Sequence, residues 1–225
     1  MTLENQISKI MVLLVVLAGS TVWGQLPTTA HPNIEGWQDL FKPDLSNAII
    51  SPGGWVMEDG LLSARGHQMI WTRESYGDFV VDLEFKVAKG ANSGVFLRPG
   101  DVGRPVTGIE VQIHETTDGQ EFGMVGAIYG AKAPSKSVAK PAGQWNRYTI
   151  ACVDSRIYVV FNGEQVIDID LDDWTEAHQN QDGTWNKFET ALKDYPRVGP
   201  VGLQGIHGKG GQLVWFRNLK VRVLD

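Results

Sequence analysis

Cysteine is almost missing from this chain of 225 residues, because Cys152 is the only one. An internal disulfide therefore cannot form, and metal sites built from paired cysteines are excluded. Cys152 lies in the apolar run 150–153, which is typical of a small buried hydrophobic residue rather than a nucleophile. The sequence also lacks HExxH and His-x-His spacings and any glycine-rich dinucleotide fingerprint, so no motif indicates a metal or nucleotide cofactor.

Positive charge is scarce as well. The chain has 20 Lys and Arg against 26 Asp and Glu, which gives a net charge of −6. No basic stripe runs along any segment of the sequence. We therefore expect neither nucleic acid nor an anionic membrane surface as a partner.

Long hydrophobic runs are absent except near the N-terminus, at residues 10–18. Lys9 precedes this run, and residues 22–24 follow it with small residues at the positions that a signal peptidase requires. The pattern predicts a secretory signal peptide over residues 1–24, since a membrane-spanning helix needs roughly 20 apolar residues. Ser20 stands where a lipoprotein would carry its lipidated cysteine. We therefore expect an exported, soluble protein, periplasmic or extracellular, without a membrane anchor.

Helical periodicity is nearly absent, and short alternating runs broken by Gly, Pro, Asn and Asp take its place. Asp-Gly at 59–60 and Asn-Gly at 162–163 are two-residue hairpin signals. Many short strands with frequent turns predict an all-β sandwich of two sheets. The expected strands are residues 55–58, 61–65, 79–87, 93–98, 109–114, 126–129, 148–153, 157–161, 165–171, 201–205 and 213–223.

The chain reads as a single domain over residues 36–225, preceded by a connector at 25–35. The stretch 172–197 is polar and aromatic, with Trp174, His178 and Trp185 in it. It is too long for a plain connection between strands, so we expect a functional loop or a lid there.

The segment 109–114 alternates apolar and polar residues with the period of a strand. Its odd-numbered residues would face a core, which places Glu110, Gln112 and His114 in one row on the opposite face. A carboxylate, an amide and an imidazole in one row suggest a polar cleft, and an ordinary exposed strand face is the alternative. We expect Glu110 to project into an open, sugar-sized hollow on the sheet.

An ordered set of short motifs covers nearly the whole domain, from about residue 36 to residue 224. The set is GDF at 77–79, NSGVFLR at 92–98, EVQI at 110–113, GAIYG at 126–130, QWN at 144–146, NG at 162–163, GLQGIHG at 202–208 and FRNL at 216–219. In this order the motifs resemble the 3-keto-disaccharide hydrolase family, formerly a domain of unknown function. The resemblance implies a concanavalin A-like jelly roll and cleavage of glycosides whose sugar is oxidised at C3.

Such a sugar requires particular chemistry. The C3 ketone acidifies the C2 proton, and its removal allows the C1 substituent to leave before water adds back. A base near C2, a donor to the C3 oxygen and an acid for the leaving group are then needed. Because no dinucleotide fingerprint is present, the oxidation at C3 would fall to another protein.

Glu110 is the first choice for the catalytic carboxylate, since partial burial would raise its pKa. The alternative is a structural ion pair with Arg98. His114 is a second candidate base, or a ligand to a divalent metal together with Glu110. His207 is a further catalytic candidate, and a bulge at Gly205 would bring it to the same face as Gln204.

Further candidates would contact substrate. Asn92, Ser93 and Gln112 could orient sugar hydroxyls, and Gln204 belongs with them. Arg98 could donate to hydroxyls or to the C3 oxygen. Tyr129 could stack on a sugar ring or act as an acid. The carboxylates are too scattered to nominate a calcium site, so the identity of any metal stays unknown.

Two functions follow from these residues. The first is an exported hydrolase or lyase for 3-keto-glycosides or disaccharides, with carbohydrate as its partner. The alternative is a non-catalytic carbohydrate-binding module, because lectin-like folds serve both purposes. A plain interaction scaffold does not require the row formed by Glu110, Gln112 and His114. The sequence leaves the oligomeric state open.

Overall fold

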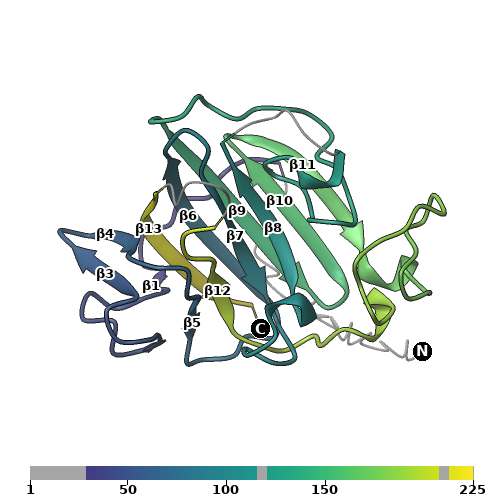
Figure 1. Cartoon of the computed structure of the whole chain (residues 1–225), viewed down its shortest axis with the longest axis horizontal. Helices are drawn as coiled ribbons and strands as arrows, with labels where there is room; N and C mark the ends of the chain where they lie inside the picture. The colour runs from purple at the N-terminus through teal and green to yellow at the C-terminus, as the bar shows by residue number, and fades with distance from the viewer. Residues whose placement is uncertain (1–28, 116–120, 208–212, 225) are drawn as a thin grey trace, which may run out of the picture.

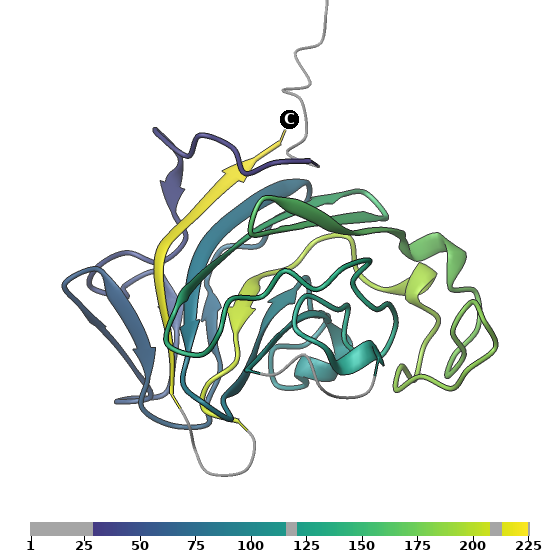
Figure 2. The same cartoon turned by 90° about the horizontal axis from the view of Figure 1, so that it is seen from above.

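The chain folds into a jelly-roll sandwich of two antiparallel sheets, as the computed structural model shows (Figure 1). The structure describes residues 29–115, 121–207 and 213–224. Seen from above, the larger sheet curves over the smaller one (Figure 2). The expected signal peptide at 1–24 lies outside the described residues. No helix in the described part of the chain is long and apolar enough to cross a bilayer.

The larger sheet has eight strands within the described ranges. Their bounds are β1 Gln38–Asp39, β3 Trp55–Glu58, β4 Leu61–Ala64, β6 Phe79–Val87, β9 Trp145–Val153, β10 Arg156–Phe161, β11 Glu164–Asp170 and β13 Val214–Val223. The order is β11-β10-β9-β6-β13-β4-β3, and β1 pairs with β13 off this path. The two hairpin signals are confirmed, because β3 pairs with β4 and β10 pairs with β11.

The smaller sheet has five strands, in the order β2-β5-β12-β7-β8. Their bounds are β2 Ala48–Ile49, β5 Ile70–Thr72, β7 Asn92–Leu97, β8 Ile109–His114 and β12 Val201–Leu203. Four short 3-10 turns complete the described elements: η1 Pro105–Thr107, η2 Glu121–Gly123, η3 Leu171–Asp173 and η4 Leu192–Asp194. β8 is therefore one of the two edge strands of the smaller sheet.

The core lies between the two sheets and follows the alternation in the sequence. Phe79, Leu83 and Phe85 of β6 are fully buried in it, opposite Val111 and Ile113 of β8. The expected strand at 126–129 is wrong. Gly126 has a φ of 87°, and this stretch forms turns, joined to β8 by an isolated bridge from Val111 and by backbone hydrogen bonds to Glu110 and Gln112.

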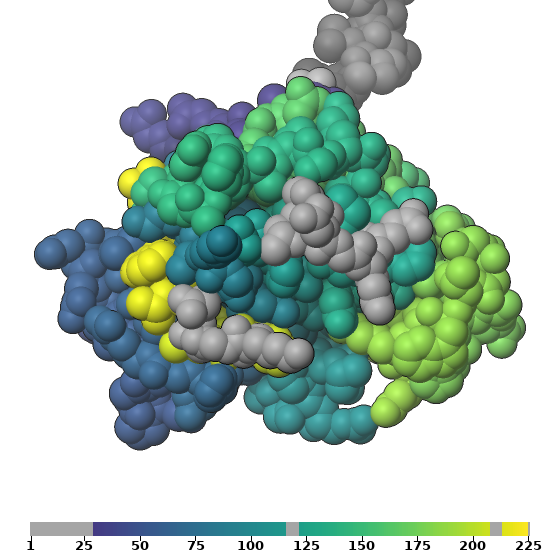
Figure 3. All heavy atoms as spheres, turned by 45° about the horizontal axis from the view of Figure 1, so that its top comes forward, coloured from purple at the N-terminus to yellow at the C-terminus, as the bar shows by residue number. Residues whose placement is uncertain are grey.

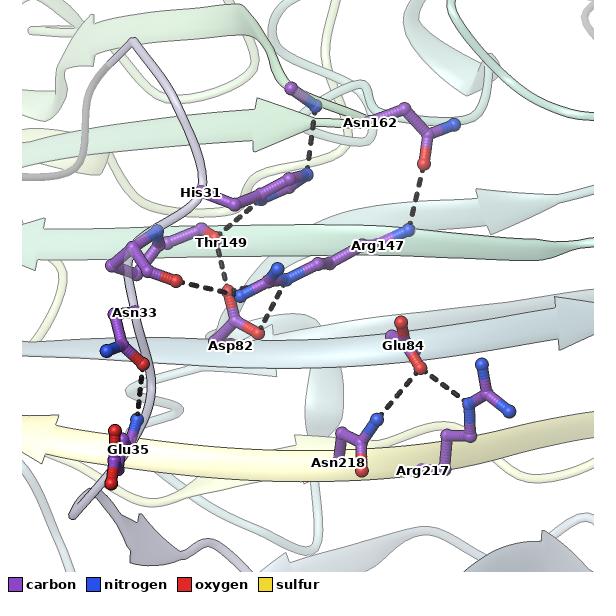
Figure 4. Close-up of polar contacts among 12 residues, drawn as sticks. His31, Asn33, Glu35, Asp82, Glu84, Arg147, Thr149, Asn162, Arg217 and Asn218 are labelled. Carbon is purple, nitrogen blue, oxygen red and sulfur yellow. Dashed lines mark hydrogen bonds and ion pairs between the residues drawn. The ribbon is translucent and has the colours of Figure 1, made fainter.

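The outer face of the larger sheet carries a buried carboxylate, which the alternation alone does not predict. Asp82 points away from the core and yet has no exposed surface. Arg147 binds it at 2.9 Å, and the hydroxyl of Thr149 donates to its other oxygen (Figure 4). His31 and Pro32 lie over this group, since Arg147 also donates to the Pro32 carbonyl. The end of the expected connector is thus packed against the sheet.

Candidate functional site

The outer face of the smaller sheet brings most of the predicted site residues together. Residues that pair across antiparallel strands point to the same face. Glu110 of β8 pairs with Phe96 of β7, which pairs with Gly202 of β12. Ile109, as a core residue, marks the opposite side of β8. Glu110 therefore points away from the core. The strand register determines which side chains share this outer face with it.

Glu110 forms an ion pair with Lys187, whose Nζ lies 3.4 Å from Oε2. The carboxylate is nearly covered, because its residue is only 6% exposed. It also leans across β7 at Gly94, where an added Cβ would lie 2.5 Å from Oε1 and 2.9 Å from Cγ. Glycine at position 94 thus leaves the space that the carboxylate occupies.

Burial dominates the electrostatics of this pair. Burial raises the pKa of Glu110, and the Lys187 ammonium opposes that rise. Burial likewise lowers the pKa of Lys187, and the Glu110 carboxylate opposes that fall. Both shifts favour the neutral forms. A raised pKa makes the Glu110 carboxylate, when it is ionised, a stronger base than an exposed glutamate.

Two buried amide oxygens flank Gly94. Gln112 pairs with Gly94 on one side, and the backbone N–H of Gln204 donates to the Gly94 carbonyl at 2.9 Å on the other. Gln112 Oε1 and Gln204 Oε1 are both buried without a hydrogen-bond partner among the described residues. A buried acceptor without a donor is costly, so this pair of oxygens suits a ligand that brings hydroxyl donors.

A third row contains His114, Asn92 and His207. Asn92 pairs with His114 on β8 and forms an antiparallel bridge with His207. Between Leu203 and His207 the chain has one residue more than between their partners Val95 and Asn92. Gln204 and His207 are three residues apart, so a regular strand would place them on opposite faces. The extra residue is a bulge, as the sequence required, and it brings both side chains to one face. His207 is exposed.

Aromatic side chains border the row that contains Glu110. Trp71 of β5 lies over Gly202, where an added Cβ would meet the ring at 2.1 Å, and its ring meets Phe96 edge-on at 6.0 Å. Tyr129 lies on the other side and is 37% exposed. The Lys187 ammonium lies 4.1 Å from the Tyr129 ring centroid. This places Tyr129 beside the ion pair.

Two predicted residues lie elsewhere. Arg98 does not pair with Glu110, so the alternative of a structural ion pair between them is wrong. Its guanidinium donates to the carbonyls of Gly77 and Asp154 and pairs with Asp78, so it ties β6 to the turn after β9. Ser93 pairs with a core residue of β8 and donates to the Gln204 carbonyl, so its hydroxyl supports the backbone instead of facing the row.

The sequence did not single out Lys187. It comes from an arm, residues 174–191, in the yellow-green part of Figure 3. A hydrogen bond joins this arm to Gly130. Asn180 donates to the Gly130 carbonyl and accepts from the indole of Trp174 and the amide of Asn186. Only the length and polarity of the 172–197 stretch signalled a functional segment, and nothing local distinguishes this lysine from a solvated one.

The expected open hollow at Glu110 is not what the structure shows, because the carboxylate is nearly covered. A hollow of about 530 Å³ lies instead beyond the arm, lined by Phe122, Lys132, Asp168 and Trp174 among others. Glu110 is not among its lining residues. The site is therefore a covered polar face at which Gln112 and Gln204 still lack donors.

Among the described residues, no three His, Cys, Asp or Glu side chains gather in a way that could hold a metal ion. The pairing of Glu110 with His114 as metal ligands stays a prediction. The group that faces Glu110 is the Lys187 ammonium, and a cation at that position would be repelled by it.

Comparison with known proteins assigns the family. The model of the 3-keto-alpha-glucoside-1,2-lyase-like domain matches residues 32–222, and the chain belongs to this family. A 3-keto-disaccharide hydrolase of Bacteroides thetaiotaomicron is 26% identical over 224 residues, a match that covers 84% of this chain and 75% of that protein.

Solved structures agree in fold. A Parabacteroides distasonis protein, assigned provisionally as a glycosyl hydrolase, superposes with a TM-score of 0.80 at 36% identity, covering 84% of this chain and 99% of its own. A carbohydrate-binding module from Bacillus subtilis shares the fold at a TM-score of 0.51 and 11% identity, covering 81% and 99%. The module from Bacillus subtilis shows a shared fold alone. The family match, the Bacteroides relative and the Parabacteroides structure support a glycosidase-like enzyme that acts on carbohydrate, and they do not favour the binding-module alternative.

Proposed function

We propose that this protein cleaves 3-keto-glycosides or 3-keto-disaccharides at the outer face of its smaller sheet, by removing the C2 proton. The observation that carries the proposal is the contact between Glu110 and Lys187, 3.4 Å apart and largely shielded from water. The C2 proton and the C3 oxygen of a 3-keto sugar stand on neighbouring carbons. A base and a cationic donor at this separation suit that pair of atoms.

Glu110 takes the C2 proton, and the electrons move onto the C3 oxygen, where the Lys187 ammonium stabilises the enediolate. The ketone re-forms, a C1–C2 double bond appears, and the bond from C1 to the leaving oxygen breaks. A protonated side chain gives the leaving oxygen its proton, and Tyr129, His114 and His207 are the candidates. Water then adds its hydroxyl at C1 and a proton at C2.

The other residues of the face would bind the sugar. The side-chain oxygens of Gln112 and Gln204 have no hydrogen-bond donor among the described residues, so they would accept hydrogen bonds from sugar hydroxyls. Asn92 lies between the two histidines. Trp71 borders the row that contains Glu110, but it is almost fully buried against Phe96 and Gly202. It would therefore support the surface on which the substrate lies and not bind the sugar itself.

The experiment compares turnover of a 3-keto-disaccharide with that of the same disaccharide unoxidised. We expect release of sugar only from the oxidised substrate. Glu110→Gln should lower kcat/KM by roughly 10²–10⁴-fold, the usual effect of losing a general base. Glu58→Gln is the matched control, since Glu58 is 69% exposed on the other sheet and pairs only with Arg65 in the described contacts. Full turnover by Glu110→Gln would contradict the proposal.

A further inference from the structure

An exposed aromatic surface stands on the arm that carries Lys187. Trp185 is 72% exposed, more than any other large hydrophobic residue among those described. Its ring is parallel to that of His178, with an angle of 4° and 5.9 Å between centroids. At this distance parallel rings are offset, so the imidazole backs part of the indole and leaves the rest open.

The arm holds this surface in place. The backbone of residues 178–180 pairs with that of 184–188, and Gln179 bridges Trp185. Asn180 and Asn186 are 5% and 2% exposed and bond to each other at 3.1 Å. The indole of Trp174 donates to the same Asn180 oxygen. An exposed indole on a backbone fixed in this way is pre-organised for a ligand, which lowers the entropy lost on binding.

The arm also links this surface to the candidate site. Trp185 precedes Lys187 by two residues, so their Cα atoms are at most about 7 Å apart. Lys187 in turn contacts Glu110 at 3.4 Å. A sugar ring joined to one that sits at Glu110 is thus within reach of the indole.

We propose that the shelf formed by Trp185 and His178 binds the second, unoxidised ring of a 3-keto-disaccharide. This inference rests on the proposed function and names the substrate it favours: a glycoside whose leaving group is itself a sugar. The apolar face of a sugar ring packs on an aromatic ring through its C–H groups, while its hydroxyls stay in water. His178 is a positioning residue, because it holds the orientation of the indole and need not touch the sugar.

The test uses two substrates and four proteins. The substrates are a 3-keto-disaccharide and a 3-keto-glucoside with a methyl leaving group. For Trp185→Ala we expect KM for the disaccharide to rise about five- to tenfold, as for the loss of one aromatic contact, with KM for the methyl glycoside unchanged. Trp185→Phe should retain most of the affinity. Trp215→Ala is the control, since Trp215 packs on Lys86 in the larger sheet.

Equal KM values for wild type and Trp185→Ala on the disaccharide would overturn the shelf, and so would an equal rise on both substrates. Failure of the proposed function gives a different result, namely no turnover of either substrate by the wild type. In that case direct binding of the 3-keto-disaccharide decides the matter. The shelf requires that Trp185→Ala bind it five- to tenfold more weakly than wild type, and equal affinities overturn it.

Discussion

Glu110 and Lys187 form a buried ion pair in which the attraction between the two charges offsets only part of the effect of burial on each pKa. Their atoms approach to 3.4 Å, and burial shifts the pKa of each toward the neutral form. Water is largely excluded from the carboxylate, so removing one partner of the pair leaves the other as an isolated buried charge. The electrostatics of Glu110 therefore depend on Lys187, although the two residues are far apart in the sequence.

Replacing Lys187 by methionine removes the charge that holds down the pKa of Glu110. That pKa should rise further, so the acid limb of the pH profile of kcat/KM should move to higher pH. The rate should also fall by about 10²-fold or more, as expected when a donor to a developing oxyanion is lost. Lys187→Arg keeps the charge and should leave the limb close to its original position.

Lys193→Met is a suitable control, because Lys193 is 42% exposed and pairs with Asp194 at the surface. A profile for Lys187→Met with an unshifted acid limb would show that another group controls ionisation at the site.

Gly94 determines where the carboxylate can lie. In Gly94→Ala the new Cβ would meet Oε1 of Glu110 at 2.5 Å and its Cγ at 2.9 Å, so the side chain must swing away. We expect kcat to fall at least about tenfold, with a loss of stability of about 1–3 kcal/mol from overpacking. Gly77→Ala is the matched control, since its Cβ would meet only Val198 at 3.9 Å. Unchanged kcat in folded Gly94→Ala would mean that the position of Glu110 is unimportant.

Among the elements, the segment at residues 31–35 has an unexpected role. His31 lies across the larger sheet, where its Nδ1 meets the Thr149 hydroxyl at 2.8 Å and its Nε2 accepts from the Gly163 amide at 2.9 Å (Figure 4). An Nε2 that accepts a hydrogen bond cannot carry a proton. Burial, reinforced by the charge of Arg147, lowers the pKa of His31 to about 4.

This lowered pKa predicts acid sensitivity. Between about pH 6.5 and pH 4 the unfolded chain binds a proton at His31 that the folded chain does not, so stability falls as the pH falls through this window. His31→Gln cannot titrate and should lack that part of the slope. The difference in unfolding free energy between the two proteins should shrink by on the order of 1–2 kcal/mol, allowing for solvent screening of a half-buried ring.

Urea unfolding at several pH values measures this difference directly. A difference that stays constant from pH 7 to pH 4 would show that the imidazole is not held in its neutral form.

For the whole molecule, the short-range part of the fold could be predicted from the sequence. Strict alternation gave the strands at 79–87 and 109–114 with their correct faces, and the turn residues at 59–60 and 162–163 gave two hairpins. These signals are local, since side-chain direction in a strand depends only on parity. The same parity argument required the bulge that brings Gln204 and His207 together.

The rest depended on contacts between distant segments. Lys187 meets Glu110 only because a buried amide network holds its arm against Gly130. Arg98 directly follows β7, yet backbone carbonyls of Gly77 and Asp154, next to β6 and β9 of the other sheet, take its donors. Asp82 points outward and is buried beneath Arg147 and the connector segment at residues 31–35. Parity cannot foresee which segment will cover a face.

The most direct test of the account is to cleave a 3-keto-disaccharide in D₂O and examine the released 3-keto sugar by mass spectrometry. Removal of the C2 proton by Glu110, followed by addition of water, predicts one carbon-bound deuterium at C2. Product incubated without enzyme corrects for spontaneous exchange, and Glu110→Gln should give neither cleavage nor deuterium. Rapid release of a product that carries no deuterium at C2 would contradict the account, because the C1 bond would then break without any reaction at C2.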